Sequence, residues 1–564
     1  MAGTSSRTRT RTKTRTRTRI IVFTICALTL LCAVAVPLLV VVAVRSRCSP
    51  DTFSRAAVAA DSHICSQIGR DILQQGGSAV DGAIAALLCT TLVNPQSMGL
   101  GGGAIFTVMD NNGRVAVINA RETVPEKTRS DLLRSCPSRF QLLSGTQWIA
   151  VPGELRGYEQ AHRLYGKLPW ATLFQPAIRL AREGFPVPKV QGGYIPFTDT
   201  NQSRALRKLF SDKDGNLLKT GDTVRFEKLA DTFQTIANHG ADVFYTGSVA
   251  RDLIHDIQEA GGTLTLQDLA QYRAKVSEPW KISLGEYQMY IPPPPAGGIV
   301  LSLVLNILKG FGLTLAAEHQ TLTYHRYVEA LKFANGLKKD LHPRLTTEAM
   351  GRKLTEDDFA DRIRTLILSD RTHEPQFYNI SHHLDTVGTT HLSVLAEDGS
   401  AVSVTSSINH IFGSRVFSPR TGVILNNQLS DFCGRVEEIF PGDQPPSSMT
   451  PALLKSPTRT LVIGGTGGSM ITTAMASAVM HHIWFGKGLR ESIAAPVIFV
   501  DAKNDLWFEA NFDKNLTEAL MALGHRQDPE AHRFFNVVNA VEKQEDGCIC
   551  AVSDSRKLGR AAGY

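Results

Sequence analysis

Several residue patterns that mark common functional sites are missing from this chain. It has only nine cysteines among 564 residues, with neither a pair of Cys-x-x-Cys knuckles nor a His-Glu-x-x-His motif. Structural zinc sites and zinc metalloproteases are therefore disfavoured. No Gly-Lys-Ser/Thr follows the glycine run 464–468, and no Gly-x-Ser-x-Gly elbow occurs. These absences argue against a P-loop nucleotide site and a conventional serine hydrolase.

Surplus charge is also missing from the body of the chain. Seven basic residues between Arg7 and Arg19 account for the whole net charge of +7. The rest is formally neutral and gives no electrostatic reason to bind nucleic acid. An uncharged run, Ile20 to Val44, follows the basic residues. Its 25 or so residues are enough to span a bilayer as a helix, and are more than a cleaved signal peptide usually has.

The positive-inside rule places the basic tail, residues 1–19, in the cytoplasm. We therefore expect a transmembrane signal-anchor over 20–44, a linker over 45–54, and an extracellular body of a single-pass type II cell-membrane protein. The body contains three Asn-x-Ser/Thr sequons, at Asn201, Asn379 and Asn515. In this topology all three would be accessible to the glycosylation machinery.

The hydrophobic periodicity predicts alternating helices and strands packed in layers, an α/β architecture. Asp61 is expected to cap a helix that ends at Gly76, and Ser78 to cap a nearly all-apolar helix through Leu92. The middle of the chain is predicted to be mostly helical, with helices over 154–166, 170–183, 229–239, 248–260 and 298–309. Strands are predicted over 104–109, 114–119, 391–396, 401–406, 422–425, 460–463, 505–509 and 548–552.

One remaining pattern could carry chemistry. Gly388-Thr389-Thr390-His391 opens a predicted strand. A threonine hydroxyl is a weak nucleophile, but a threonine at a chain terminus can use its own α-amino group as the general base. A preceding glycine tolerates the strained backbone that lets the hydroxyl attack the peptide bond before it. A Gly-Thr pair at a strand start is usually only a turn, and Thr390 is an equally good candidate by position alone.

Ordered motifs along residues 55–564 resemble the γ-glutamyl transpeptidase (glutathione hydrolase) family. They include Arg55-Ala-Ala-Val-Ala-Ala-Asp61, Asn119-Ala-Arg-Glu122, Thr389-Thr-His-Leu-Ser393, Gly467-Gly468 and Ser553-Asp-Ser-Arg-Lys557. The resemblance implies an αββα sandwich of the N-terminal-nucleophile hydrolase type. It also implies self-cleavage between Gly388 and Thr389 into fragments 55–388, preceded by the anchor, and 389–564, which remain together as a heterodimer.

The resemblance assigns a role to each matching residue. Thr389 is the nucleophile, Ser407 supports it, and Gly467 and Gly468 form the oxyanion hole. Substrate binding falls to Arg121, Ser407, Asn409, Gln428, Asp431, Ser447, Ser448 and Gly468. Gln428 stands where some relatives have glutamate, so weaker discrimination for the substrate's charged end is expected. Cys65 and Cys89 match the family's disulfide, whereas Cys433 is expected to be a free thiol.

The activity implied by the resemblance is cleavage of the γ-glutamyl bond of glutathione and its S-conjugates, leukotriene C4 among them. The γ-glutamyl group would pass to water or to an acceptor amino acid or dipeptide, with no metal or organic cofactor. Two alternatives stay open: another amidase of the same class, and an unprocessed ectodomain without enzymatic activity.

Overall fold

The computed structural model describes residues 48–49, 51–137, 141–200, 203–338, 341, 348–379, 388–529 and 537–564. The chain divides into two units, Met1–Thr52 and Phe53–Tyr564. The elements discussed below belong to the second unit. The predicted cytoplasmic tail and anchor, residues 1–44, lie outside the described residues. Within the described part, no helix combines the length and apolar character needed to cross a membrane.

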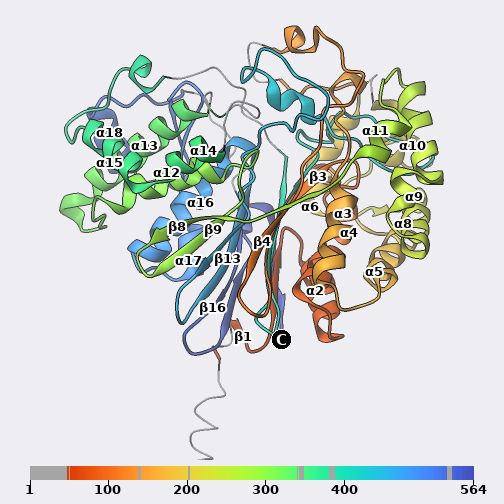
Figure 1. Ribbon diagram of the computed structural model, residues 1–564, viewed down its shortest axis with the longest axis horizontal. Coiled ribbons are helices and arrows are strands. Elements are labelled where there is room, and N and C mark those ends of the chain that lie inside the picture. The colour runs from red at the N-terminus through yellow and green to blue at the C-terminus, as the bar shows by residue number, and fades with distance from the viewer. Residues whose placement is uncertain are drawn as a thin grey trace, which may run out of the picture. The chain divides into compact units, whose positions relative to one another are not determined.

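Two antiparallel sheets lie face to face at the centre of the Phe53–Tyr564 unit (Figure 1). The first has the order β18-β2-β10-β11-β3-β4-β7, and the second contains β17-β16-β13-β12-β9-β8. The first sheet's strands are β2 (Ala57–Ala60), β3 (Gly103–Met109), β4 (Val115–Ala120), β7 (Lys275–Ser277), β10 (Thr390–Leu395), β11 (Ala401–Ser407) and β18 (Ala562–Gly563). The second sheet's strands are β8 (Trp280–Leu284), β9 (Tyr287–Ile291), β12 (Ala452–Lys455), β13 (Thr460–Thr466), β16 (Val537–Lys543) and β17 (Ile549–Val552).

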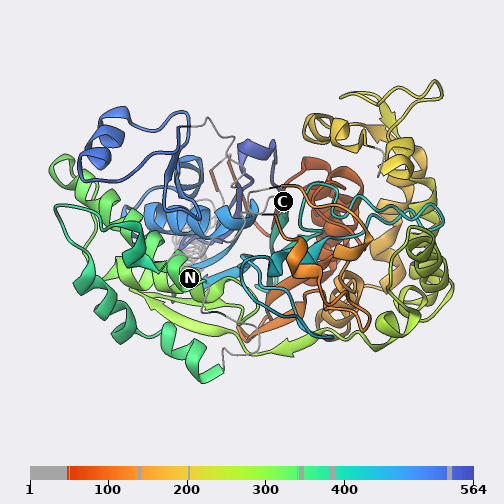
Figure 2. The ribbon, with the colours of Figure 1, turned by 90° about the horizontal axis from the view of Figure 1, so that it is seen from above.

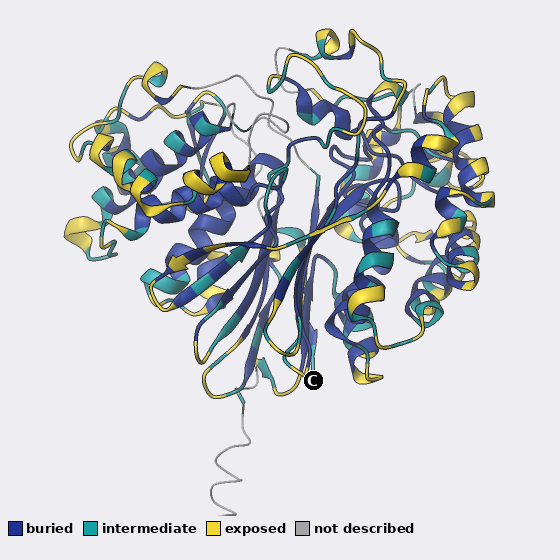
Figure 3. Ribbon diagram, viewed as in Figure 1, coloured by how far each residue is buried: buried dark blue, intermediate teal, exposed yellow. Residues whose placement is uncertain are grey.

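A small apolar cluster joins the facing sides of the two sheets. Ala59 and Leu395 come from the first sheet, and Leu453, Val462 and Val541 from the second. The central strands are therefore buried on both faces, as the dark strands of Figure 3 show. The polar residues of these strands are buried as well and are hydrogen-bonded across the two sheets: Ser393 donates to the Asn539 carbonyl at 3.0 Å, and Ser403 to the Ile463 carbonyl at 2.9 Å.

Helices cover the outer face of each sheet and complete four layers (Figures 1 and 2). One outer layer contains α2 (His63–Gln74), α3 (Ala79–Val93), α4 (Glu154–Tyr165), α5 (Trp170–Glu183), α8 (Glu227–His239) and α10 (Ser248–Glu259). The other contains α12 (Gly298–Lys309), α13 (Gln320–Leu337), α15 (Asp357–Leu366), α16 (Ile471–Val479), α17 (Leu489–Ala494) and α18 (Lys514–Ala522). The αββα sandwich is confirmed.

Most predicted helices are confirmed, and so are the strands predicted over 104–109, 114–119, 391–396 and 401–406, with ends that move by one or two residues. Ser78 forms a capping box with Asp81, and all of α3 is buried. The nearly all-apolar composition of this helix is thus explained by its place between the first sheet and α5.

Four details differ from the sequence predictions. Ser62, not Asp61, precedes α2, because the Asp61 carboxylate accepts hydrogen bonds from other elements. Residues 422–425 form isolated bridges and no strand. The predicted helical middle also contains β8 and β9. After Gly467, a short 3₁₀ turn, α16 and a π-helix over Met480–Trp484 replace one continuous helix.

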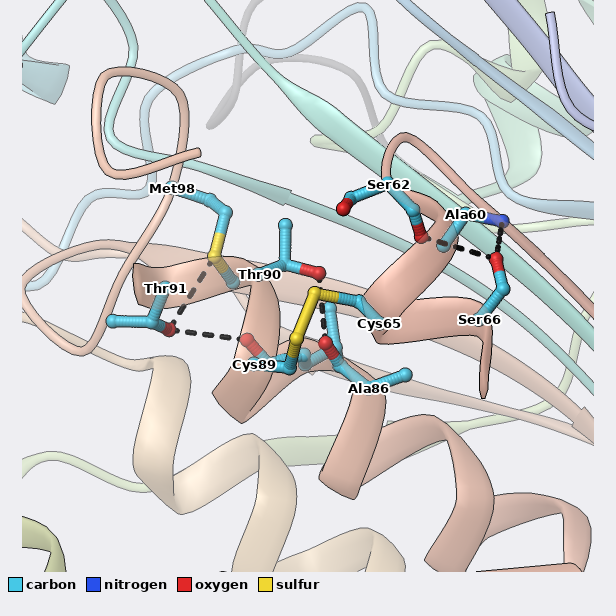
Figure 4. Close-up of a disulfide and its surroundings, with 10 residues drawn as sticks. Ala60, Ser62, Cys65, Ser66, Ala86, Cys89, Thr90, Thr91 and Met98 are labelled. Carbon is cyan, nitrogen blue, oxygen red and sulfur yellow. Dashed lines mark hydrogen bonds between the residues drawn. A yellow bond between two sulfur atoms is a disulfide. The ribbon is translucent and has the colours of Figure 1, made fainter. Parts of the chain in front are cut away.

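The expected disulfide between Cys65 and Cys89 is present and joins α2 to α3 (Figure 4). Thr90 and Thr91 follow it on α3 and donate to the carbonyls of the preceding turn, at 2.7 and 3.1 Å. The bridge lies in the helical layer outside the first sheet. It therefore fixes two scaffold helices and touches none of the predicted substrate-binding residues.

Candidate active site

The bond predicted to be cut lies at the start of β10, at the end of the first sheet. The Thr389 hydroxyl donates to the Gly388 carbonyl oxygen at 2.5 Å, and Ser407 Oγ donates to the same oxygen at 2.9 Å. Ser407 lies at the end of the neighbouring strand β11, which positions it beside the bond. The nucleophile candidate and a polarising hydroxyl thus meet at one carbonyl group.

Gly388 adopts a backbone conformation that favours glycine. Its φ is +123°, and a Cβ atom at this position would lie 2.3 Å from the Asn409 carbonyl oxygen. A side chain would therefore be strained and would collide with the backbone. The backbone conformation therefore requires glycine at position 388, whatever part this residue has in cleavage.

Replacing Gly388 by alanine is expected to slow accumulation of the two fragments by about tenfold or more, because the clash moves the carbonyl away from the Thr389 hydroxyl. Gly399→Ala is the matched control: it also has positive φ, but nothing lies within 4 Å of the added atom. A time course on a reducing gel measures both variants. Equal cleavage rates in the two variants would contradict this role for Gly388.

The neighbouring threonine has a different environment. Thr390 Oγ1 donates to Asp61 Oδ2 at 2.6 Å, and Lys557 Nζ donates to the same carboxylate oxygen at 2.7 Å. Lys557 also donates to the Thr389 carbonyl oxygen at 2.5 Å. Thr390 is therefore engaged in the scaffold, while the Asp61–Lys557 pair anchors the backbone of Thr389.

Arg121 and Asp431, predicted to bind opposite charges of one substrate, are paired with each other. Arg121 follows β4 and is 1% exposed, and its Nη2 lies 2.5 Å from Asp431 Oδ2. Its other donors reach the carbonyls of Pro445 and Pro446, each at 3.1 Å. These bonds hold the guanidinium plane in one orientation, as bidentate binding of a carboxylate requires.

Two buried acceptors beside this pair have no hydrogen-bond partner among the described residues: Asp431 Oδ1 and Gln428 Oε1. Gln428 Nε2 donates to Asp431 Oδ2 at 3.0 Å, so the two side chains lie together. Buried acceptors without donors are costly. An ammonium group, which carries only donors, would satisfy both.

A second carboxyl group lies behind Arg121. Glu122 is fully buried, and its Oε2 is 3.5 Å from Arg121 Nη1. Burial raises the pKa of Glu122 to about 7, and the neighbouring Arg121 acts in the opposite direction. The guanidinium therefore has carboxyl groups on two sides, which helps to keep it buried without substrate.

The remaining predicted residues gather around the same narrow pocket. Its lining includes Arg121, Thr389, Ser407, Asn409, Gln428, Asp431, Ser447, Ser448 and Gly468. Gly467 lies one position earlier, at the end of β13, and both glycines have positive φ. The cavity measures about 20 Å³.

Cys433 is not a free thiol, and that prediction is wrong. It forms a disulfide with Cys136 across a sequence separation of 297 residues. The cysteine ends the short 3₁₀ helix Gln428–Phe432 that carries Gln428 and Asp431. The bridge therefore attaches the 3₁₀ helix that carries Gln428 and Asp431 to the segment around Cys136. Nothing in the local sequence of Cys433 indicates a partner so far away.

Peptide mapping of the unreduced protein is expected to recover one peptide containing Cys136 linked to one containing Cys433. Reduction before digestion should release both with free thiols. The Cys65–Cys89 pair serves as an internal standard for complete oxidation. Recovery of Cys433 as an unlinked thiol in protein whose Cys65–Cys89 bridge is intact would contradict the assignment.

The fold and site define an N-terminal-nucleophile hydrolase, and comparison with known proteins supplies the family. The γ-glutamyltranspeptidase family model matches residues 65–564, and the chain belongs to this family. Glutathione hydrolase 5 proenzyme of Rattus norvegicus is 46% identical over 555 residues, covering 93% of this chain and 96% of the relative. The Homo sapiens protein of the same name is 44% identical over 569 residues, with the same coverage.

Solved structures agree with this assignment. Cephalosporin acylase from Bacillus halodurans has a TM-score of 0.82 and 25% identity, covering 92% of this chain and 97% of that one. Helicobacter pylori γ-glutamyltranspeptidase has a TM-score of 0.53 and 25% identity, covering 58% of this chain and 95% of that one.

Some residues at the site were not predicted to belong to it. Lys557 donates to the Thr389 carbonyl oxygen and to Asp61. The pocket is also lined by Arg435, Met449 and Ile471. Asp61 and Lys557 belong to motifs that the sequence displays at opposite ends of the ectodomain. Only the fold shows that these two motifs meet beside Thr389.

Proposed function

We propose that this protein is a self-processing γ-glutamyl hydrolase and transferase that acts on glutathione and its conjugates. The observation that carries the proposal is the Thr389 hydroxyl against the Gly388 carbonyl, in the pocket that also contains Arg121 and Asp431. A nucleophile and a pair of opposite charges in one pocket suit an amide whose other end is an α-amino acid.

In the first step, Thr389 Oγ attacks the Gly388 carbonyl carbon while Ser407 Oγ donates to the carbonyl oxygen. The peptide nitrogen of Thr389 leaves with a proton, and an ester joins Gly388 to the hydroxyl. Water then hydrolyses the ester. The products are the fragments ending at Gly388 and beginning at Thr389, the second with a free α-amine.

In the second step, the same hydroxyl attacks the γ-glutamyl carbonyl, and the new α-amine takes its proton. Backbone N–H groups of Gly467 and Gly468 receive the developing oxyanion. The leaving amine takes the proton, and a γ-glutamyl ester remains on Thr389. Water, or the amine of an acceptor amino acid or dipeptide, then removes the γ-glutamyl group.

Arg121, with Ser447 and Ser448, binds the α-carboxylate of the substrate, while Asp431, Gln428 and Asn409 receive its α-ammonium. The unpartnered oxygens of Asp431 and Gln428 support this assignment. When substrate binds, its carboxylate would pair with Arg121 and its ammonium with Asp431, in place of the direct Arg121–Asp431 pair. Little charge would then be left uncompensated in the closed pocket.

Leukotriene C4 is the conjugate we propose among the substrates. An adjoining cavity shares Ser447 and Ser448 with the pocket and is lined by Pro294, Ile299 and Val300. The lining also includes Lys338 and Arg435, so the lipid substituent on the sulfur would lie against its apolar part. The names of the glutathione hydrolase 5 relatives support glutathione as the common donor.

We further propose a type II membrane protein with this body outside the cell, on the charge and length of residues 1–44. Asn379 and Asn515 are exposed and open to glycosylation, whereas Asn201 lies outside the described residues. Protease protection of sealed vesicles, with and without detergent, tests the topology.

Incubation with glutathione is expected to release glutamate and cysteinylglycine. The analogue that lacks only the α-amino group should react with a kcat/KM at least about 100-fold lower, because Asp431 and Gln428 would lose their donor. Product release measured by mass spectrometry gives both values. No release from glutathione would remove the proposed activity, and equal rates would remove the ammonium assignment.

The similarity to cephalosporin acylase keeps a second amidase function in view. Arg121 and Asp431 favour an α-amino acid end over other acyl groups. A direct comparison of glutathione with an acylated β-lactam nucleus distinguishes the two. A persistent single chain with no activity on either would favour a non-enzymatic ectodomain.

A further inference from the structure

A second cavity, of about 300 Å³, lies in the outer helical layer of α13 and α18. It shares no lining residue with the pocket that contains Thr389. Its walls come from Lys332 on α13, the segment 371–378, the turn at Asn504, and the last residue of α18 with the residues that follow it. Its volume is that of a small-molecule site and not of a packing defect.

The inner wall contains a buried cation held by a chain of hydrogen bonds. Lys332 Nζ donates to Thr372 Oγ1 at 2.7 Å and to His525 Nδ1 at 2.8 Å. The other nitrogen of His525 bonds to His325 Nδ1 at 2.8 Å, and His325 Nε2 donates to the Leu368 carbonyl. Burial lowers the pKa of Lys332 to about 8, so it is a cation at neutral pH.

These bonds fix both imidazoles as neutral tautomers and determine what the wall can bind. His325, Glu329 and His525 lie close enough to suggest a metal site. However, His525 Nδ1 already accepts from Lys332, and its other nitrogen donates to His325. The lone pairs of both imidazoles already accept hydrogen bonds from other residues of the chain, and the Lys332 ammonium lies beside them. The cluster therefore suits an organic ligand better than a metal ion.

Asn504 is a second, independent indication of a ligand. It lines the cavity and is 3% exposed, and neither its amide nitrogen nor its oxygen has a hydrogen-bond partner among the described residues. A buried amide without partners is costly. The φ of Asn504 is +64°, a backbone conformation that glycine adopts with less strain. The amide can both donate and accept.

The charges around the cavity are mixed. Lys332, Arg371 and Arg526 line it together with Glu374. Each cation also has a carboxylate neighbour outside the lining: Glu329 at 3.8 Å, Asp370 at 3.8 Å and Asp505 at 2.9 Å. A bare anion or a bare cation would meet repulsion from part of this set. A ligand with both signs can match it.

We propose that this cavity is a second binding site, for a small zwitterion of amino-acid or dipeptide size. Its carboxylate would lie near Lys332 and the arginines, its ammonium near Glu374, and its peptide group against Asn504. The proposal stands on this cavity alone and does not depend on the function proposed for Thr389.

Glycylglycine is the probe, measured by titration calorimetry on the processed enzyme. Asn504→Gly removes the amide and keeps the positive φ, and should weaken binding by about tenfold or more. Arg526→Gln should weaken it about threefold, since that side chain is exposed. Arg251→Gln, an exposed arginine on α10, is the matched control and should bind as wild type.

Hydrogen exchange provides the location. In wild type, glycylglycine should slow exchange in 371–378 and 501–505, and this slowing should be lost in Asn504→Gly. The variant should keep the wild-type kcat/KM for glutathione, which separates this site from the catalytic pocket. Equal binding by wild type and Asn504→Gly would overturn the proposal. So would absence of binding, or equally tight binding of acetate or ethylammonium.

Discussion

Thr389→Ala is expected to leave the protein as one uncut chain with no measurable γ-glutamyl transfer. The substitution removes the Thr389 hydroxyl, which donates to the Gly388 carbonyl oxygen at 2.5 Å. Both steps of the mechanism use that hydroxyl, so kcat/KM should fall by about 10⁴-fold or more. A reducing gel and a glutathione hydrolysis assay measure the two losses on the same sample.

Thr390→Ala is the matched control for this experiment. It removes a hydroxyl of the same kind one residue later, where it binds Asp61 and not the scissile bond. This variant should still separate into two fragments and hydrolyse glutathione. If Thr389→Ala is cut and Thr390→Ala is not, the position of the nucleophile is wrong by one residue.

Arg121→Gln is expected to lower kcat/KM for glutathione by about 100-fold, mostly through KM. The change removes a charged, bidentate partner of the substrate carboxylate and leaves Asp431 without its 2.5 Å guanidinium contact. Initial rates over a range of glutathione concentrations separate KM from kcat. The maximal rate should change less, because Arg121 does not touch the reacting carbonyl in the proposed mechanism.

Arg129→Gln is the control, since that arginine is near Arg121 in sequence but is exposed and, among the described residues, forms an ion pair with Asp131 alone. It should hydrolyse glutathione at the wild-type rate. Thermal unfolding of both variants distinguishes lost binding from lost folding. An Arg121→Gln enzyme with unchanged KM would remove the carboxylate assignment.

The sequence predicted the layered fold because its strongest elements are determined locally. α3 has a capping box at Ser78, which marks the start of a helix, and an apolar sequence with no polar face, which requires that helix to be buried. The strands predicted over 391–396 and 401–406 were equally clear, and they pair as β10 and β11. By contrast, the prediction of a mostly helical middle missed β8 and β9, although their alternation of buried with exposed or partly exposed residues is a strand pattern; β9 pairs with β12, and β8 pairs with β9 at the sheet edge.

At the site, the ordered motifs indicated which residues to expect, but not how those residues meet. Asp61 was expected to cap a helix, because an acid before an amphipathic run commonly does so. In the fold, Lys557 lies 2.7 Å away from it, although nearly 500 residues separate the two in sequence. Local sequence preference predicts a helix cap. A contact between residues so far apart in sequence is formed only by the tertiary fold.

The Cys136–Cys433 disulfide would link the two fragments covalently after the proposed cleavage at Gly388–Thr389. The two cysteines lie on opposite sides of the Gly388–Thr389 bond, so breaking the backbone there leaves one molecule and not two. Unfolding of the mature enzyme would then involve a single covalently linked molecule. Its thermal unfolding midpoint would not shift with protein concentration, whereas that of a dissociating dimer does. Refolding likewise needs no encounter between fragments, because each remains within reach of the other at high effective concentration.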